Sequence, residues 1–272
     1  MTPLSETLLV IFNIACFSLF GVAVFETLRL DAASRESLFR RTFQWLVPFV
    51  VLLIVVIFSA IAVSPPESRI KWIAQITAIF FDAAAIFFFA VAGQVFYRRA
   101  QDEETFLQPE EESGISRGRR IAETLGLIAL CQVISVVLFR IFPTKTTHLF
   151  SDVFPLQDLP PLIGVTLLMA ILAKAAVFEE VMFRLFLFSG LILWAGERRG
   201  RFALAFVFPA ILWAMGHAGV FEEDFVKLLQ IFLIGLLLSA TYLRLGFRAC
   251  LWVHIGFNLT LPITAQLFFR FE

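Results

Sequence analysis

Two adjacent carboxylates and an arginine interrupt a long apolar run at Ala176-Val177-Phe178-Glu179-Glu180-Val181-Met182-Phe183-Arg184. The apolar run extends from about residue 159 to 195, which is long enough to cross a bilayer because about 20 apolar residues suffice. A charge near the middle of such a segment costs roughly 2.5 to 3.5 kcal/mol on insertion scales. We therefore expect these charges to face other helices, a water-filled cavity or each other, and not lipid.

The composition of the whole chain is that of a polytopic membrane protein. Of the 272 residues, 60% are hydrophobic and 16% are charged, whereas soluble domains average about 45–50% apolar and about 25% charged residues. The formal net charge is zero, which gives no reason to expect nucleic-acid binding. Cys16, Cys131 and Cys250 lie in apolar runs without a CxxC pattern, so they predict neither a disulfide framework nor a cysteine zinc site.

The apolar runs predict an all-α, polytopic transmembrane bundle of about eight helices. The expected spans are 8–28, 43–63, 73–96, 121–142, 159–195, 202–215, 225–243 and 249–269. We interpret the first as a retained helix and not as a removed signal peptide, because it lacks preceding basic residues and a small-residue cleavage site. The long polar segment 97–120, expected to be a solvated loop, divides accessory helices in 1–120 from a functional core in 121–272.

The basic residues suggest an orientation in the membrane. They gather in the loops after the first, third, fifth and seventh spans, and the positive-inside rule places such loops in the cytoplasm. Both termini then lie outside, provided that 159–195 crosses once as a long or bent helix. If this run crosses twice, the sides of all later loops are exchanged.

Polar residues inside the later spans share helix faces in pairs. His254 and Asn258 are four residues apart, as are Trp213 and His217, and side chains at this spacing lie on one face of a helix. Ionisable residues inside a membrane indicate function by default.

The same spacing joins one of the two glutamates to the arginine. Glu180 and Arg184 can pair, whereas Glu179 points about 100° away and has no local partner. Such a carboxylate in a poorly hydrated pocket can act as a general base near neutral pH. Two imidazoles and an amide can orient a water molecule and donate hydrogen bonds to a developing oxyanion.

A metal site is an alternative use of these side chains. Two histidines, one glutamate and a water form a catalytic zinc set, so a Zn²⁺ ion would be held by Glu179, His217 and His254. The HExxH pattern is absent, and the ligands would come from three separate spans. Lys174, by contrast, is expected to be a packing or snorkelling lysine, and His148 an exposed loop residue.

Taken together, three motifs resemble the CAAX prenyl protease 2 family and its bacterial relatives, the CPBP or Abi intramembrane peptidases. The family pattern has Glu-Glu-x-x-x-Arg, then aromatic-x-x-x-His, then His-x-x-x-Asn or Asp, and the chain carries these at 179–184, 213–217 and 254–258. Trp213 stands where the pattern often has Phe. The resemblance covers about 159–260 and does not extend to the first four spans.

This resemblance implies a polytopic endopeptidase that cuts a membrane-associated protein or peptide, prenylated in some members. Family members have been discussed as metallopeptidases and as metal-independent glutamate peptidases, so the resemblance does not decide between a Zn²⁺ cofactor and none. The charge-lean, Phe-rich chain with short loops is typical of bacteria or archaea, and we expect an integral protein of the prokaryotic inner membrane.

The resemblance also implies roles for individual residues. Glu179 would activate water with help from His217, and His254 and Asn258 would stabilise the oxyanion. The remaining motif residues would support the site, and these are Glu180, Arg184 and Trp213.

Two other classes of function remain as alternatives. Buried Glu, His and Arg also form proton relays in transporters, although no internal repeat of the transporter kind is visible in this sequence. A scaffold or bacteriocin-immunity protein could keep the family fold and bind a partner without cutting. The intact motif positions favour the enzyme.

Overall fold

The computed structural model describes residues 21–22, 26–102, 115–143, 159–196, 198–218 and 224–268. Every regular element in this part of the chain is a helix, so the predicted all-α bundle is confirmed. Five described helices are long and apolar enough to cross a membrane, namely Ala32–Val63, Ile76–Asp102, Arg117–Ile141, Pro161–Ala195 and Asp224–Leu245. The chain is therefore a multi-pass membrane protein.

The described helices match seven of the eight expected spans. They are α2 (Ala32–Val63), α3 (Pro66–Asp102), α4 (Arg117–Ile141), α6 (Pro161–Glu179), the π-helix η2 (Glu180–Phe188), α7 (Ser189–Ala195), α8 (Arg199–Met215), α9 (Asp224–Leu245) and α10 (Phe247–Phe268). Most of the first expected span, 8–28, lies outside the described residues, and Cys16 and His148 lie outside them as well.

The polar segment 97–120 is helical at both of its ends, contrary to the expected loop. α3 continues to Asp102, and α4 begins at Arg117. The physical reason at the second boundary is a helix cap, because the Ser116 side chain accepts a hydrogen bond from the Arg119 backbone N–H.

The apolar run around the two glutamates forms one continuous helical stretch, so the single crossing is confirmed over the double one. Pro161 opens α6 at a position where its missing N–H costs no hydrogen bond. The helical hydrogen bonding changes from α to π between Glu179 and Glu180. The stretch ends at Gly196, whose φ of 53° lies in the left-handed region.

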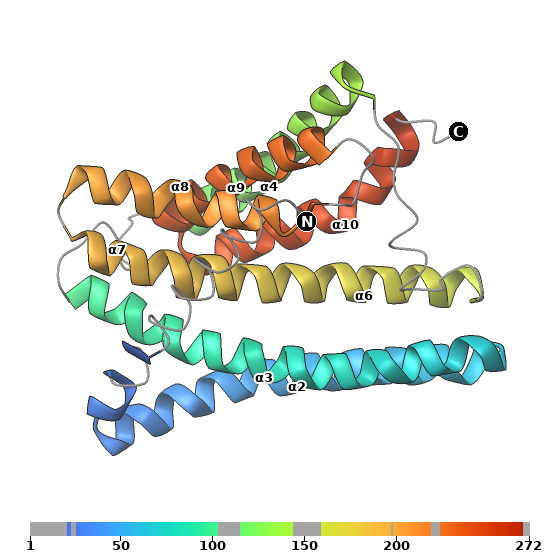
Figure 1. Cartoon of the computed structure of the whole chain (residues 1–272), viewed down its shortest axis with the longest axis horizontal. Coiled ribbons are helices and arrows are strands. Elements are labelled where there is room, and N and C mark those ends of the chain that lie inside the picture. The colour runs from blue at the N-terminus through green and yellow to red at the C-terminus, as the bar shows by residue number, and fades with distance from the viewer. Residues whose placement is uncertain are drawn as a thin grey trace, which may run out of the picture.

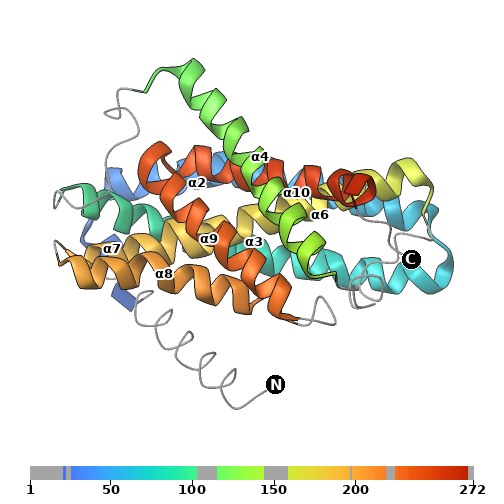
Figure 2. The ribbon, with the colours of Figure 1, turned by 90° about the horizontal axis from the view of Figure 1, so that it is seen from above.

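This stretch lies between two groups of helices (Figure 1). On one side α2 and α3 run next to each other, and α3 packs on η2 and α7. On the other side lie α4, α8, α9 and α10, with α10 against α6 and α8 against η2. Figure 2 shows α4 crossing α9 and α10, which it contacts.

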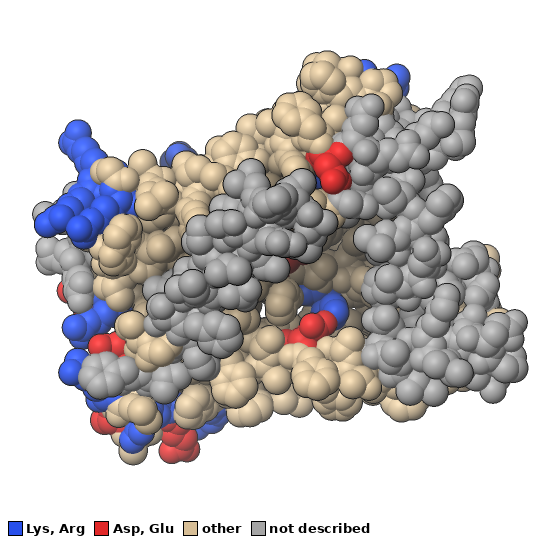
Figure 3. Space-filling view, viewed as in Figure 1, with Lys and Arg blue, Asp and Glu red and all other residues tan. Residues whose placement is uncertain are grey.

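Basic residues gather at one end of the molecule, where α2 begins, α3 ends and α8 begins (Figures 1 and 3). Exposed examples are Arg40, Arg99 and Arg199. The positive-inside argument requires these helix ends to lie on the same side of the membrane. Their position at one end of the bundle meets this requirement. Which side faces the cytoplasm stays a prediction.

Lys174 on α6 pairs with Asp82 on α3. The two side chains are partly exposed, and Figure 3 shows acidic and basic atoms in a hollow at the centre of this face. A charge pair inside membrane helices satisfies both groups away from lipid. Lys174 is thus a packing lysine, as expected, and its partner joins α3 to α6.

Close helix packing depends on Gly93, where α3 meets η2. A Cβ at this position would lie 2.6 Å from the backbone carbon and oxygen of Leu185. Small residues of this kind let membrane helices approach closely, which is the main source of their association.

We predict opposite effects of the same substitution at two glycines. Gly93→Ala should destabilise the protein by about 1–3 kcal/mol through overpacking. Gly126→Ala on α4 meets nothing within 4 Å and should be neutral or stabilising by up to about 1 kcal/mol. Thermal unfolding in detergent measures both, and an equal melting temperature for the two variants would contradict the packing argument.

Candidate active site

The two adjacent glutamates diverge at the junction of α6 and η2. Glu179 is the last residue of α6 and Glu180 the first of η2. The Glu180 side chain is completely buried, whereas that of Glu179 is 19% exposed. One carboxylate therefore belongs to the packed interior, and the other lies at the edge of an accessible space.

Three groups satisfy the buried Glu180 carboxylate. Arg184 Nη1 forms an ion pair with Oε1 at 3.1 Å, without the alignment of a hydrogen bond. The same Oε1 accepts a hydrogen bond from His254 Nδ1 at 2.7 Å, and Oε2 accepts one from the Cys250 thiol at 2.8 Å. The expected pair is thus present, and a buried carboxylate with such partners need not be neutral.

Arg184 in turn contacts two further helices. Its Nη2 donates to the Gly235 carbonyl oxygen of α9 at 3.3 Å. Its guanidinium lies 4.5 Å from the centre of the Trp213 ring of α8, within the range of a cation–π interaction. Arg184 therefore fixes η2 against α8 and α9.

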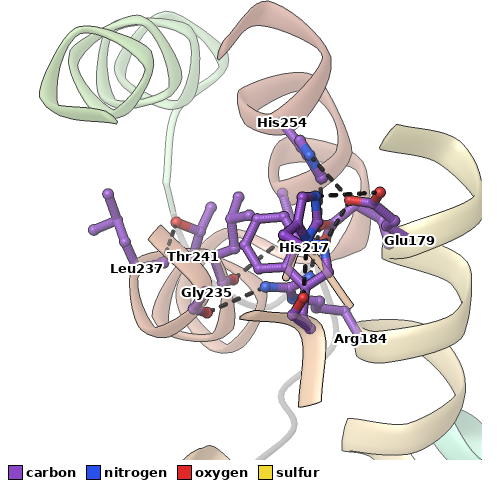
Figure 4. Close-up of polar contacts among 11 residues, drawn as sticks. Glu179, Arg184, His217, Gly235, Leu237, Thr241 and His254 are labelled. Atoms are coloured by element: carbon purple, nitrogen blue, oxygen red, sulfur yellow. Dashed lines mark hydrogen bonds and ion pairs between the residues drawn. The ribbon is translucent and has the colours of Figure 1, made fainter. Parts of the chain in front are cut away.

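Glu179 faces the two histidines (Figure 4). Its Oε2 accepts a hydrogen bond from Trp213 Nε1 at 2.6 Å and lies 3.6 Å from His254 Nε2. Its Oε1 lies 3.9 Å from His217 Nε2. Glu179 thus has no partner on its own helix, as expected, but Trp213 of α8 holds one of its oxygens.

The Nδ1 atom of each imidazole contacts a hydrogen-bond acceptor, which fixes the orientation of the ring. His217 Nδ1 lies 2.9 Å from the Trp213 carbonyl oxygen, and His254 Nδ1 contacts the Glu180 carboxylate. Carbonyl and carboxylate oxygens only accept hydrogen bonds, so each Nδ1 carries the proton. In the neutral rings both Nε2 atoms then direct a lone pair toward Glu179.

Trp213 is the packing centre of the group. Its side chain is almost fully buried, and its ring makes edge contacts with His217 and His254, with centroids 5.5 and 5.1 Å apart. Its classification as a supporting residue is consistent with these contacts.

Asn258 does not join the group around Glu179 through its amide nitrogen. That atom donates to the Leu172 carbonyl oxygen of α6 at 3.2 Å. Leu172 lies about 10 Å along the helix axis from Glu179, at 1.5 Å per residue. An oxyanion role would need the second N–H of the amide, or a rotation of the side chain when substrate binds.

The residues named for a metal suit zinc by their chemistry but not by their arrangement. Two neutral imidazole nitrogens and a carboxylate form a known donor set for zinc. Histidines that bind a metal through one ring nitrogen usually donate a hydrogen bond from the other to an oxygen acceptor, as the two Nδ1 atoms do here. Within the described residues, however, no three His, Cys, Asp or Glu side chains lie together as a metal-binding group. We therefore derive no step through a metal.

One charged residue near the site was missed in the sequence. Lys227 on α9 is buried and lies within electrostatic range of Glu179 and His217. Its place inside the expected span 225–243 could have identified Lys227 from the sequence, because an ionisable residue within a membrane span indicates function by default. Cys250 was also missed as a partner of Glu180, because nothing in its apolar run indicates polar contact.

We predict that identical substitutions at the two glutamates have different effects on stability. Glu180→Gln leaves the buried Arg184 without its counter-charge and should cost about 3–5 kcal/mol. Glu179→Gln keeps an oxygen that can accept from Trp213 and should cost less than about 1 kcal/mol. Thermal unfolding of both variants in detergent tests this, and equal losses would show that the two carboxylates share one environment.

The comparisons with known proteins agree with the motifs. The family described as type II CAAX prenyl endopeptidase Rce1-like matches residues 160–260, which include η2, α8, α9 and most of α10. No curated protein and no solved structure matches the chain. The family is one of CAAX-type intramembrane proteases, so the chemistry it supports is peptide hydrolysis. Residues 160–260, which hold every motif of the candidate site, are thus similar to the Rce1-like family of type II CAAX prenyl endopeptidases.

Proposed function

We propose that this protein is an intramembrane endopeptidase in which Glu179 and His217 activate a water molecule to hydrolyse a peptide bond. The observation that carries the proposal is the convergence of both Nε2 atoms on the Glu179 carboxylate, at 3.6 and 3.9 Å. These separations exceed a direct hydrogen bond. They leave a water molecule within reach of the base and an imidazole together.

The first step is the attack of water. A water between Glu179 Oε1 and His217 Nε2 donates one hydrogen to each, which leaves an oxygen lone pair for the carbonyl carbon of the substrate. Glu179 takes a proton as the new C–O bond forms, and the carbonyl oxygen becomes the oxyanion. The protonated Glu179 then gives the proton to the leaving amine nitrogen as the C–N bond breaks.

His254 and Asn258 are the proposed donors to the oxyanion. A doubly protonated His254 would present Nε2–H toward the substrate while Nδ1–H stays on Glu180. This use of a carboxylate to orient an imidazole is the arrangement of the hydrolase triads. Asn258, one turn further along α10, would add an amide N–H.

The other motif residues hold this arrangement. Glu180 fixes the ring of His254, Arg184 balances Glu180, and Trp213 holds Glu179 by its N–H and His217 by its carbonyl oxygen. None of these three needs to change its bonding during the reaction, which is the preorganisation that efficient catalysis requires.

The proposed substrate is a membrane-associated protein or peptide, and the proposed setting is a prokaryotic inner membrane. The family description names CAAX prenyl endopeptidases, so the first substrate to test is an internally quenched peptide ending in a prenylated Cys-a-a-X sequence. The same peptide without the prenyl group shows whether the lipid is needed.

Loss of the proposed base should remove activity without unfolding the protein. Glu179→Gln and His217→Ala should each lower kcat by about 10²–10⁴-fold, measured with the quenched peptide in proteoliposomes. Trp213→Phe is the matched control, because it keeps the ring beside Arg184 and loses only one N–H, and it should cost about tenfold. Cleavage by Glu179→Gln at the wild-type rate would disprove the assignment, and partner binding without any cleavage would favour a scaffold.

Metal removal should leave the activity unchanged, because the chain's own groups suffice for every step above. The measurement is the cleavage rate after dialysis against a chelator, together with the zinc content of the purified protein. A rate that is lost on dialysis and restored by Zn²⁺ would instead make Glu179, His217 and His254 metal ligands.

A further inference from the structure

The face of α9 that points away from the candidate active site carries a groove that the proposed mechanism does not use. Its lining comes from α4 and α9 alone, and its volume is about 380 Å³, within the range of about 300–1,000 Å³ that small-molecule sites occupy. At 100° per residue, Arg244 in this lining is turned about 180° from Gly235, the α9 residue whose carbonyl oxygen takes part in the site. Figure 4 shows two lining residues, Leu237 and Thr241, on the opposite side of the drawn group from Glu179. The α4–α9 groove is therefore separate from the active site.

The α4–α9 groove is long and mostly apolar. On α4 it runs from Glu123 to Leu130, which is about 10 Å along the helix axis. On α9 it runs over a similar length, from Leu237 to Leu245. Gly126 holds its middle open, because a Cβ at this position would meet nothing within 4 Å. A groove of this shape, parallel to two membrane helices, fits a hydrocarbon chain.

Two arginines and a glutamate lie at one end of the groove, where α4 begins and α9 ends. Glu123 Oε1 accepts hydrogen bonds from Arg119 Nε at 2.9 Å and from Arg244 Nη2 at 3.0 Å, and its Oε2 accepts one from Arg244 Nε at 3.1 Å. A guanidinium has five N–H donors, so these bonds use one donor of Arg119 and two of Arg244. The two arginine side chains are 64% and 60% exposed. Their other donors can therefore bind an acceptor from outside the protein.

The position of these charges indicates the chemistry of the ligand. They lie near the ends of two helices that are long and apolar enough to cross a membrane, and the ends of such helices meet the headgroup region of a bilayer. Two arginines and one glutamate have a net charge of +1, and arginine is well suited to bind phosphate. A basic pocket between membrane helices is a site that anionic lipid headgroups occupy.

We propose that the α4–α9 groove is a binding site for one anionic phospholipid. The lipid phosphate contacts the guanidiniums of Arg119 and Arg244, and one acyl chain lies in the groove along Gly126. A zwitterionic lipid can fill the same apolar groove but brings no net charge to balance the arginines. The site should therefore select lipids by the charge of their headgroup.

The lipid adds contacts to a helix that has few of its own. Only 11% of the most apolar stretch of α4 is buried, the lowest share among the five candidate spans. Polar bonds join α4 to α9 on either side of the groove, through Glu123 and Arg244 at one end and through Gln230 and Ser135 farther along. A ligand that binds only when α4 lies against α9 stabilises the folded bundle by mass action.

The alternative is that Glu123 and the arginines only clamp α4 to α9. Any bilayer lipid would then cover the groove equally well, and headgroup charge would have no effect on stability. The two explanations therefore differ in their dependence on lipid charge and on open space at Gly126.

The test is thermal unfolding of the full chain in detergent with added dioleoyl phosphatidylglycerol or dioleoyl phosphatidylcholine. At about ten times its dissociation constant, phosphatidylglycerol should raise the melting temperature by about 3–6 °C, and phosphatidylcholine by less than about 1 °C. Inorganic phosphate at the same concentration should have no effect, because it has no chain to fill the groove. Equal shifts with the two lipids, or with phosphate and phosphatidylglycerol, would overturn the proposal.

Two variants separate this site from general attraction to an anionic surface. Arg119→Gln/Arg244→Gln should lose the shift produced by phosphatidylglycerol. Arg40→Gln/Arg41→Gln is the matched control, because it removes the same charge from exposed positions on α2 and should keep the shift. Each variant is compared with itself in the absence of lipid, so a change in its basal stability does not affect the result. Equal lipid shifts in the two double variants would contradict a site at the groove.

Filling the groove tests the acyl-chain contact. Gly126→Phe places a ring where the chain should lie and should reduce the phosphatidylglycerol shift by at least half. Gly200→Phe is the matched control, since a Cβ at Gly200 on α8 also meets nothing within 4 Å and this residue does not line the groove. An undiminished shift in Gly126→Phe would show that no chain occupies the groove.

Native mass spectrometry gives a second measurement that needs no variant to fold. With equal amounts of the two lipids added, the wild-type protein should retain one phosphatidylglycerol, and retention of both lipids without preference would overturn the proposal. None of these measurements uses peptide cleavage, so the lipid site and the proposed peptidase function can fail independently.

Discussion

The fully buried carboxylate of Glu180 is the constraint around which the site is built. A charge in the apolar interior of a helix bundle is tolerated only with a counter-charge and hydrogen bonds. Arg184, His254 and Cys250 supply these from η2 and α10. Satisfying one side chain thus fixes the distance between two helices and the orientation of an imidazole.

In this proposal Glu179 is the reactive carboxylate, because the charge of Glu180 is already taken up by its buried partners. Two carboxylates that follow each other in a helix point in different directions, so one can be taken up by packing while the other faces an accessible space. The π-helix begins at the same junction, and such segments occur frequently at functional sites. The single stretch from α6 to α7 therefore provides both the anchor of the site and its base.

Charged residues elsewhere in the membrane part follow the same rule. Lys174 and Asp82 join the α2–α3 side of the molecule to α6, and Lys227 is tied to α4 through Gln230. Each lies between helices and has a polar partner, which is the arrangement that the high cost of a charge in lipid predicts.

The sequence by itself determined the features that depend on local periodicity and composition. Apolar runs located seven of the described helical stretches, and the four-residue spacing of Glu180 and Arg184 correctly predicted their pair. The tertiary structure decided the contacts between distant helices, because no local pattern encodes them. The indole of Trp213 reaches Glu179 across 34 residues of sequence and Cys250 reaches Glu180 across 70, while Asn258 turns to Leu172 and Lys227 approaches the site. These contacts arise from how the helices pack against one another, and packing is a property of the whole bundle and not of any one segment.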